Sequence, residues 1–166
     1  MGRAYDLAEE ALRLARGAGL MIVTAESCTG GLVAGALTEV PGSSEAMDRG
    51  FVTYSNLAKT QMIGVPADLI KARGAVSEEV ARAMAEGALR TAGAGLAVAI
   101  TGVAGPGGGS EAKPVGLVHF AAVRHGAPVL HREKRFGPLS RREIREKSVE
   151  VALEMLCEAA GKTDVA

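Results

Sequence analysis

The hydrophobic pattern alternates between two periods, one typical of amphipathic helices and one typical of buried strands. Apolar residues at helical spacing predict helices over residues 7–15, 32–40, 58–63, 78–91 and 141–156, with another helical turn at 67–72. Short continuous apolar runs predict strands at 20–23, 51–54, 96–100, 115–123 and 129–134. Ser77 and Ser140 precede two of the helices and belong to the residue types that cap helix N-termini.

This order of elements predicts a single α/β domain over residues 1–166. Alternating helices and strands are typical of parallel strands joined by crossover helices. The run at 96–100 is apolar at every position, as in a strand covered on both faces. His125-Gly126 predicts a hairpin turn, which would place one antiparallel strand in the sheet. We therefore expect a three-layer α/β/α fold with a mixed, mostly parallel sheet of about five strands.

Composition narrows the possible functions. The 166 residues include 19 basic and 19 acidic side chains, so no net charge attracts nucleic acid or an anionic membrane. No apolar run approaches the ~20 residues of a membrane span, and the acidic, amphipathic N-terminus is unlike a signal peptide. Cys28 and Cys157 show neither metal nor disulfide spacing. We expect a cytoplasmic protein that binds neither nucleic acid nor membrane, and Met1 with a complete first helix favours a standalone chain.

Three polar segments follow three of the predicted strands. They read TAESCTGG (24–31), TYSNLAK (53–59) and TGVAGPGGGSEAKPVG (101–116). Ligands of open α/β sheets gather at the carboxyl ends of the strands. The sequence therefore predicts one site at that edge, built from these segments.

Ser27 is the candidate nucleophile in the first segment. It precedes a predicted helix, where free backbone N–H groups stabilise negative charge. Amides from Cys28 to Gly30 would form an oxyanion hole. The alternative, the commoner role for such a turn, is that Ser27 or Thr29 only caps the helix. Cys28 is the rival nucleophile, because a helix N-terminus lowers the pKa of a thiol.

Lysine is a better candidate than histidine for the base. His119, His125 and His131 fall in the late strands and their turn, away from the ends of the first three strands. Lys59 follows the second strand, in the segment expected beside Ser27, among largely apolar neighbours. Burial there would lower its pKa toward neutrality. On composition alone, a solvated helix lysine is at least as common.

The glycine-rich third segment is a candidate phosphate site. Its glycines allow a backbone to approach a ligand, and backbone amides can cradle phosphate. It carries neither a Walker motif nor a following helix, and a flexible surface loop is the alternative. Thr101, at the strand end, is placed to touch the reacting centre.

Basic residues gather at the start of the last predicted helix, where cations oppose the helix dipole. They are Arg141, Arg142, Arg145 and Lys147. A bound anion would account for them, although ion pairs with nearby glutamates are commoner.

Together these motifs resemble one known family. The matching pieces occur in the family's order over about 120 residues: TAESCTGG (24–31), PGSS (41–44), RGFVTYSNLAK (49–59), GAVSEEVA (74–81), AITGVAGPGGGSEAKPVG (99–116) and the R-x-x-x-R of Arg141 and Arg145. The chain is similar to the nicotinamide-mononucleotide deamidases, also known as the C-terminal domain of the competence/damage-inducible CinA proteins. The residues alone indicate no more than a hydrolase or a phosphate binder.

The resemblance implies an activity and a set of site residues. Family members are described as hydrolysing the amide of nicotinamide mononucleotide to nicotinic acid mononucleotide and ammonia, without a metal or other cofactor, and tend to be homodimers. The motifs place the nucleophile at Ser27 and its base at Lys59. They also assign Tyr54 and Thr101 to the catalytic site. Substrate binding is expected of Cys28, Thr29, Gly30, Ser44, Gly102, Gly105, Gly108, Arg141 and Arg145.

Two positions depart from the family pattern. Gly107 stands where AGP-D-GG is expected, and Leu117 stands where the strand usually reads PVG-T-V. Neither removes a proposed catalytic group. The alternative function is a catalytically silent nucleotide-binding or regulatory module of the CinA type. A phosphatase or kinase-like site is disfavoured, because the strand ends lack acidic clusters for a metal.

Overall fold

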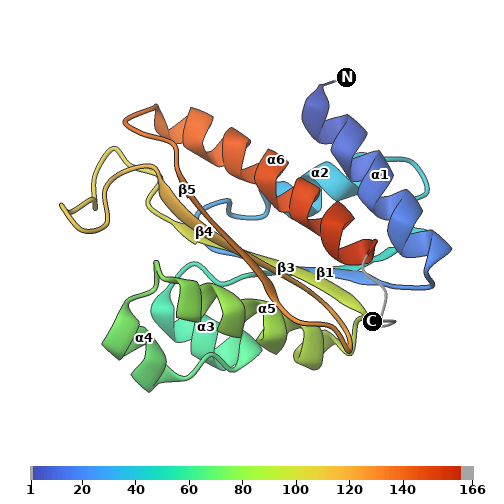
Figure 1. The fold of residues 1–166 in the computed structure, drawn as a ribbon, viewed down its shortest axis with the longest axis horizontal. Helices are drawn as coiled ribbons and strands as arrows, with labels where there is room; N and C mark the ends of the chain where they lie inside the picture. Colours follow the sequence, from blue (N-terminus) through green and yellow to red (C-terminus); the bar gives the residue numbers. More distant parts are fainter. Residues whose placement is uncertain (1, 162–166) are drawn as a thin grey trace.

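Two layers of helices enclose a central sheet in this computed structural model, which describes residues 2–161 (Figure 1). One layer contains α1 (Arg3–Gly17), α2 (Leu32–Thr38) and α6 (Arg141–Ala160). The opposite layer contains α3 (Asn56–Ile63), α4 (Ala67–Arg73) and α5 (Glu78–Ala92). The strands between them are β1 (Ile22–Glu26), β2 (Met47–Val52), β3 (Leu96–Gly102), β4 (Leu117–Arg124) and β5 (Leu130–Arg135), and the short 3-10 helix η1 (Ser43–Glu45) precedes β2. The three-layer prediction is confirmed.

The sheet is mixed and its strands lie in the order β2-β1-β3-β4-β5. β1 pairs in parallel with both β2 and β3, whereas β4 is antiparallel to β3 and β5. Within residues 2–161, β4 alone therefore runs against the other strands, which confirms the predicted antiparallel strand. The carboxyl ends of β1, β2 and β3 meet at one edge of the sheet.

Side chains of β3 alternate between the two halves of the core. Leu96, Val98 and Ile100 pack in the half that contains α1, α2 and α6. Ala97 and Ala99 face the half that contains α5. Each large side chain buried in this way contributes about 1.5–3 kcal/mol, and the alanines leave room for α5 against the sheet.

A glycine in α5 allows the close approach of α3. A Cβ atom at Gly87 would lie 2.0 Å from the carbonyl oxygen of Ile63, the last residue of α3. The other end of α3 is capped by Ser55, whose side chain accepts a hydrogen bond from the Ala58 amide. The close approach at Gly87 places α3, and with it Lys59, against α5, and the cap fixes where α3 begins.

The predicted caps of the two longest late helices are confirmed. The Ser77 side chain accepts from the amide of Val80 at the start of α5. Ser140 and Glu143 form a reciprocal capping box at the start of α6.

Two predicted strand boundaries are wrong. β1 continues to Glu26 rather than ending at Val23, because Thr24 and Glu26 are polar residues that are nevertheless buried. β2 covers Met47–Val52 rather than 51–54. As an edge strand with mostly exposed side chains, it has no continuous apolar run that the sequence could reveal.

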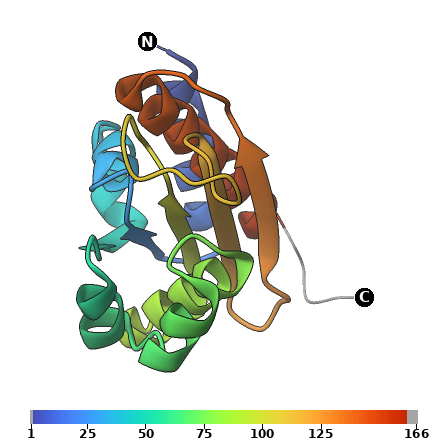
Figure 2. The ribbon, with the colours of Figure 1, turned by 90° about the vertical axis from the view of Figure 1, so that its left-hand side faces the viewer.

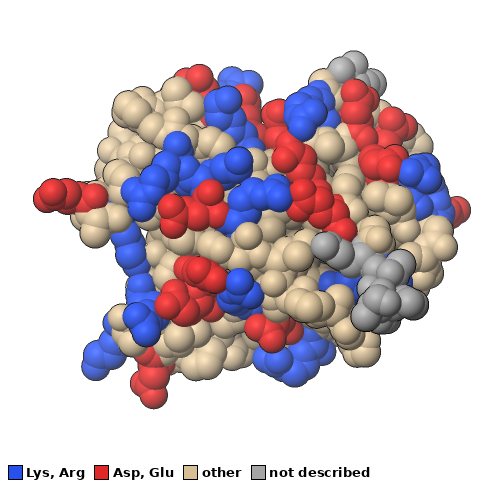
Figure 3. Space-filling model, viewed as in Figure 1, with Lys and Arg blue, Asp and Glu red and all other residues tan. Residues whose placement is uncertain are grey.

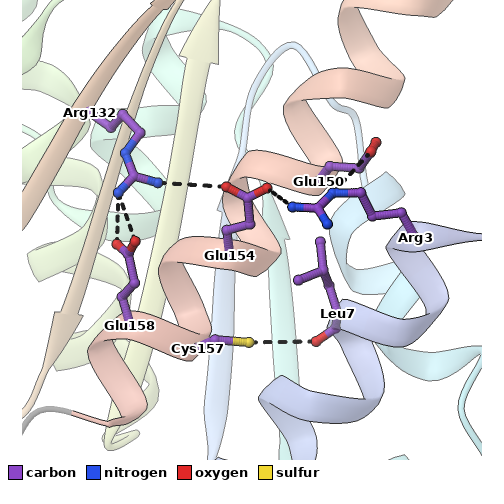
Figure 4. Close-up of polar contacts among 7 residues, drawn as sticks. All are labelled: Arg3, Leu7, Arg132, Glu150, Glu154, Cys157 and Glu158. Atoms are coloured by element: carbon purple, nitrogen blue, oxygen red, sulfur yellow. Dashed lines mark hydrogen bonds and ion pairs between the residues drawn. The ribbon is translucent and has the colours of Figure 1, made fainter.

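An ion-pair network joins α6 to its neighbours on the surface (Figure 4). Arg3 of α1 contacts Glu150 and Glu154, and Arg132 of β5 contacts Glu154 and Glu158. Such partly exposed pairs contribute about 0–1 kcal/mol each. Figure 3 shows basic and acidic side chains interspersed over this face. Among the described residues, no helix combines the length and the apolar character needed to cross a membrane.

Candidate active site

A cavity of about 330 Å³ opens at the carboxyl ends of β1 and β3. In Figure 2 the glycine-rich loop, in yellow to gold, lies in front of the strands at this edge. All three polar segments predicted to form a site contribute to the cavity, as does the 75–76 segment before α5. The lining residues are Ser27, Cys28, Tyr54, Asn56, Lys59, Ala75, Val76, Thr101, Gly102, Val103, Ala104, Gly105, Gly107, Gly108 and Arg141.

Ser27 and Lys59 are in direct contact in this cavity. The Lys59 Nζ atom lies 3.1 Å from the Ser27 Oγ atom. Lys59 is only 1% exposed and Ser27 8% exposed, although both line the cavity. Lys59 also donates to the carbonyl oxygens of Thr53, at 2.9 Å, and Tyr54, at 3.4 Å. The amine is therefore held between two backbone acceptors and one hydroxyl.

Burial lowers the pKa of Lys59 below its ordinary value of 10.5. The neighbouring Cys28 has a smaller, opposing influence on this pKa. No Asp or Glu is among the described residues that line the cavity, so no carboxylate there stabilises the ammonium form. The direction of the shift is the one that a general base requires.

Cys28 is poorly suited to be the nucleophile. Desolvation raises the pKa of its thiol to about 12, and Glu26 adds to this effect. At pH 7 only about one Cys28 side chain in 10⁵ would then be a thiolate, the form that attacks carbonyl groups. The expectation that the start of α2 lowers this pKa is wrong, because burial outweighs it.

The backbone amides after Ser27 are only partly available to a substrate. The amide of Gly30 donates to the carbonyl oxygen of Ser27, so its predicted place in an oxyanion hole is wrong. The amide of Ser27 donates to Ile100. Among the residues described, the amides of Cys28 and Thr29 donate to no other residue, and of these two only Cys28 lines the cavity, so its amide remains for an oxyanion.

Thr29 and Gly30 do not line the cavity, although the resemblance assigns both to substrate binding. Thr29 is fully buried, and its hydroxyl donates to a carboxylate oxygen of Glu26 at 2.7 Å. Gly30 adopts a left-handed conformation with φ of 55°, which turns the chain toward α2.

Thr101 lines the cavity from the end of β3. Its hydroxyl donates to the carbonyl oxygen of Ala75 at 2.9 Å, which ties the 75–76 segment to the sheet. Gly102 follows, and a Cβ atom there would lie 2.7 Å from a Val118 methyl group. Glycine at this position therefore permits the close pairing of β3 with β4 beside the cavity.

Arg141 bridges two sides of the cavity. Its guanidinium donates to the carbonyl oxygen of Gly105 at 2.7 Å and to the Tyr54 hydroxyl at 3.1 Å. Lys113 fixes the far end of the same loop by donating to the carbonyl oxygen of Arg73. The glycine-rich segment, which includes Gly105 and Gly108, is thus held at both ends by cations.

The other basic residues of α6 behave differently. Arg145 does not line the cavity but donates to the carbonyl oxygens of Cys28, at 3.0 Å, and Thr29, at 3.4 Å. Arg142 forms an ion pair with Glu146, the arrangement expected for an ordinary helix surface.

Ser44 lies away from the cavity in this single chain. It is exposed in η1, just before Met47 of β2, which pairs with Ile22 at the start of β1. Ser27 follows the opposite end of β1. The place of Ser44 in the site stays a prediction of the resemblance.

The histidines are not in the cavity either. His119 and His131 face each other, with Nδ1 and Nε2 2.9 Å apart, and burial lowers both pKa values. No histidine is among the described lining residues, which agrees with the choice of lysine as base. Within the described residues, no three His, Cys, Asp or Glu side chains are grouped to hold a metal ion.

Two polar residues in or next to the cavity were not singled out from the sequence. Asn56 begins α3 and lines the cavity directly after Tyr54 and Ser55. Glu26 immediately precedes Ser27 and is fully buried. A charged residue between an apolar run and a glycine turn was the available signal for Glu26, since it indicates either a loop or a buried anion.

Comparisons with known proteins agree with these observations. The family model of the CinA C-terminal domain matches residues 4–160. The CinA-like protein of Mycobacterium sp. (strain JLS) is 54% identical over 139 residues, which cover 84% of this chain and 33% of that protein. The chain thus spans about a third of the length of such curated relatives.

Solved structures match nearly the whole chain. The crystal structure of the competence/damage inducible protein CihA from Agrobacterium tumefaciens has a TM-score of 0.94 and 52% identity, and covers 98% of each chain. A CinA superfamily protein from Klebsiella pneumoniae 700603 has a TM-score of 0.89 and 34% identity, and covers 95% of this chain and 97% of its own.

Proposed function

The chain belongs to the family of CinA C-terminal domains, and from this premise we propose that it is an amidohydrolase that deamidates nicotinamide mononucleotide. The observation that carries the proposal is the 3.1 Å contact between Lys59 Nζ and Ser27 Oγ in a cavity. A hydroxyl beside a desolvated amine is the arrangement of an activated nucleophile and its base.

The surroundings of Lys59 favour proton abstraction from Ser27. A neutral amine has two N–H donors and one lone pair. The carbonyl oxygens of Thr53 and Tyr54 can only accept hydrogen bonds, so they engage the two N–H groups. The lone pair is then directed at the Ser27 hydroxyl.

In the proposed reaction, Lys59 takes the Ser27 proton while Ser27 Oγ forms a bond to the carboxamide carbon. The carbonyl electron pair moves to the oxygen, which the amide of Cys28 stabilises. Collapse of this intermediate breaks the C–N bond, and Lys59 returns the proton to the departing ammonia. A water molecule then gives a proton to Lys59 and attacks the acyl-enzyme, which releases the acid and restores the Ser27 hydroxyl.

The charge of the cavity supports a nucleotide substrate. Arg141 lines it and makes its hydrogen bonds to a carbonyl and a phenol, with no carboxylate among its described partners. A phosphate can therefore approach this guanidinium without displacing an acid. The volume of about 330 Å³ is at the small end of ligand sites, which suits a mononucleotide better than a dinucleotide.

Two further expectations stay predictions, namely the cytoplasmic location, which was inferred from composition, and the homodimer, which the resemblance implies. All large apolar side chains that are exposed among the described residues come from the 32–62 region around the edge strand β2. Exposed apolar side chains are what a subunit interface buries, and they support the homodimer on that ground.

The test is ammonia release from nicotinamide mononucleotide by the wild type and by Ser27→Ala. We expect turnover by the wild type and a loss of about 10³-fold or more in the variant, because a nucleophile and its base act as a unit. Tight binding of the nucleotide without ammonia release would instead favour the silent module. Near-wild-type turnover by Ser27→Ala would refute the assigned nucleophile.

A further inference from the structure

A fully buried glutamate immediately precedes the turn that carries the proposed nucleophile. Glu26 is the last residue of β1, is 0% exposed, and precedes Ser27. Its carboxylate accepts five hydrogen bonds. The donors are Thr24 Oγ1 at 3.2 Å, Thr29 Oγ1 at 2.7 Å, and the amides of Gly31 at 3.2 Å, Val33 at 2.9 Å and Ala34 at 3.0 Å.

These contacts describe a site built for an anion inside the protein. A buried carboxylate is costly unless donors replace its hydration, and backbone N–H groups at a helix start are strong donors to it. No Lys, Arg or His lies within ion-pair distance of Glu26 among the described residues. The carboxylate is therefore held by hydrogen bonds alone.

Glu26 also limits which backbone amides are free to donate a hydrogen bond to the substrate. It occupies the amides of Gly31, Val33 and Ala34 at the start of α2, so these donors are unavailable to an oxyanion. Its negative charge also offsets the positive end of this short helix. The unengaged amides of the turn are then those of Cys28 and Thr29, of which that of Cys28 belongs to a residue that lines the cavity.

The turn is held from two directions. From the end of β1, the Glu26 carboxylate accepts a hydrogen bond from the Thr29 hydroxyl at 2.7 Å. From α6, Arg145 donates to the carbonyl oxygens of Cys28 and Thr29. Arg145 therefore holds the peptide unit that joins Cys28 to Thr29, Glu26 holds the Thr29 side chain, and neither Arg145 nor Glu26 lines the cavity.

We propose that Glu26 is a positioning residue, which acts through Thr29 to hold the Ser27–Gly31 turn in the geometry that stabilises the oxyanion. This inference rests on the proposed function, because it takes Ser27 as the nucleophile. Glu26 contacts neither the cavity nor the reacting atoms, so its influence is on the rate of acylation and not on substrate affinity.

The experiment compares two isosteric substitutions that each remove one hydroxyl donor from the same carboxylate. Thr29→Val breaks the bond within the turn, whereas Thr24→Val breaks a bond within β1 and serves as the matched control. Thr29→Ser retains the hydroxyl and serves as the rescue. The first readout is the rate at which a fluorophosphonate probe labels Ser27, a reaction in which Lys59 takes the Ser27 proton, the Oγ–P bond forms, the P–F bond breaks and fluoride leaves. Intact mass detects it, with Ser27→Ala as blank.

We expect Thr29→Val to label about tenfold or more slowly than the wild type, and Thr24→Val and Thr29→Ser to stay within about threefold. For nicotinamide mononucleotide, kcat of Thr29→Val should fall by a similar factor with KM unchanged within about twofold. A merely structural role would affect both valine variants alike. Glu26→Gln gives a second reading, because the amide nitrogen cannot accept from a backbone N–H, and its labelling rate should fall at least as far.

The outcomes separate the two claims. If the wild type is labelled and Thr29→Val reacts as fast as Thr24→Val, or Glu26→Gln reacts as fast as the wild type, the positioning role is refuted and the nucleophile stands. If the wild type neither labels at Ser27 nor releases ammonia, the proposed nucleophile fails, and the positioning role fails with it.

Discussion

Replacement of Lys59 by methionine tests both the chemistry and its electrostatic basis. Methionine is also unbranched and fits the space of the lysine stem, but it has no amine. The variant loses the 3.1 Å contact to Ser27 Oγ and the donor to the Thr53 carbonyl. We expect turnover of nicotinamide mononucleotide to fall by about 10²–10⁴-fold, the usual contribution of a general base.

The stability of the same variant should depend on pH in a defined direction. Because burial lowers the Lys59 pKa, the unfolded chain holds a proton that the folded protein lacks between that lowered pKa and 10.5. Raising the pH through this window therefore stabilises the wild type by about 1.4 kcal/mol per pH unit. Below the lowered pKa the full penalty is present and constant. Lys59→Met carries no such penalty, so the stability that it gains over the wild type is largest below the lowered pKa and vanishes above 10.5.

A second contribution, which does not depend on pH, lowers the stability of Lys59→Met. The lost hydrogen bond to the buried Thr53 carbonyl costs about 1–3 kcal/mol at every pH. The change with pH of the difference in unfolding free energy between the variant and the wild type is therefore more informative than the sign of that difference at one pH. Lys71 of α4 is exposed, and Lys71→Met is the matched control for replacing a lysine by methionine.

The assay combines urea unfolding with a pH–rate profile, both from about pH 6 to pH 11. The pH at which the stability difference begins to change reports the Lys59 pKa of the free protein. The acid limb of kcat/KM should fall at the same pH, since the base must be neutral to accept the Ser27 proton. A stability difference that is flat across this range, or an acid limb at a clearly different pH, would refute the reasoning.

The remaining predictions concern the thiols and the cavity arginine. Burial raises the pKa of Cys28 to about 12 and that of Cys157 to about 11, so iodoacetamide should modify the folded protein about a hundredfold more slowly than the urea-unfolded chain, as measured by mass. Rapid labelling of Cys28 in the folded state would restore it as the rival nucleophile. Arg141→Lys cannot bridge Gly105 and Tyr54 with one ammonium, so KM for nicotinamide mononucleotide should rise about tenfold with a smaller change in kcat. An unchanged KM would contradict a role for Arg141 in binding.

The meeting of Ser27 and Lys59 could be anticipated because it depends on strand direction. Their segments follow β1 and β2, which are neighbouring parallel strands, so both segments leave the sheet at the same edge. Alternation of helices and strands in the sequence is sufficient to predict this. The depth of burial of Lys59 was not predictable, because it depends on the contact of α3 with Gly87 of α5.

The roles of residues whose side chains bond to backbone groups were harder to predict from the sequence than the roles of residues that line the cavity. Arg145 matches a family motif and was expected at the substrate, yet it donates to the carbonyls of Cys28 and Thr29. Glu26 appeared to belong to a polar loop, because its five donors come from residues whose positions only the folded turn defines. The sequence shows that a side chain is charged, but it does not show whether that side chain bonds to a ligand or to a peptide group of the protein.

The same dry environment explains why serine and lysine suit this site and a neighbouring cysteine does not. Desolvation is the leading cause of both the lowered pKa of Lys59 and the raised pKa of Cys28. It disfavours the charged form of each group. For lysine the uncharged form is the base, so burial activates it, whereas for cysteine the uncharged thiol is unreactive, so burial silences it. A serine hydroxyl needs no prior ionisation when a neutral amine lies at hydrogen-bond distance, and Ser27 is therefore the residue of this turn that burial favours as nucleophile.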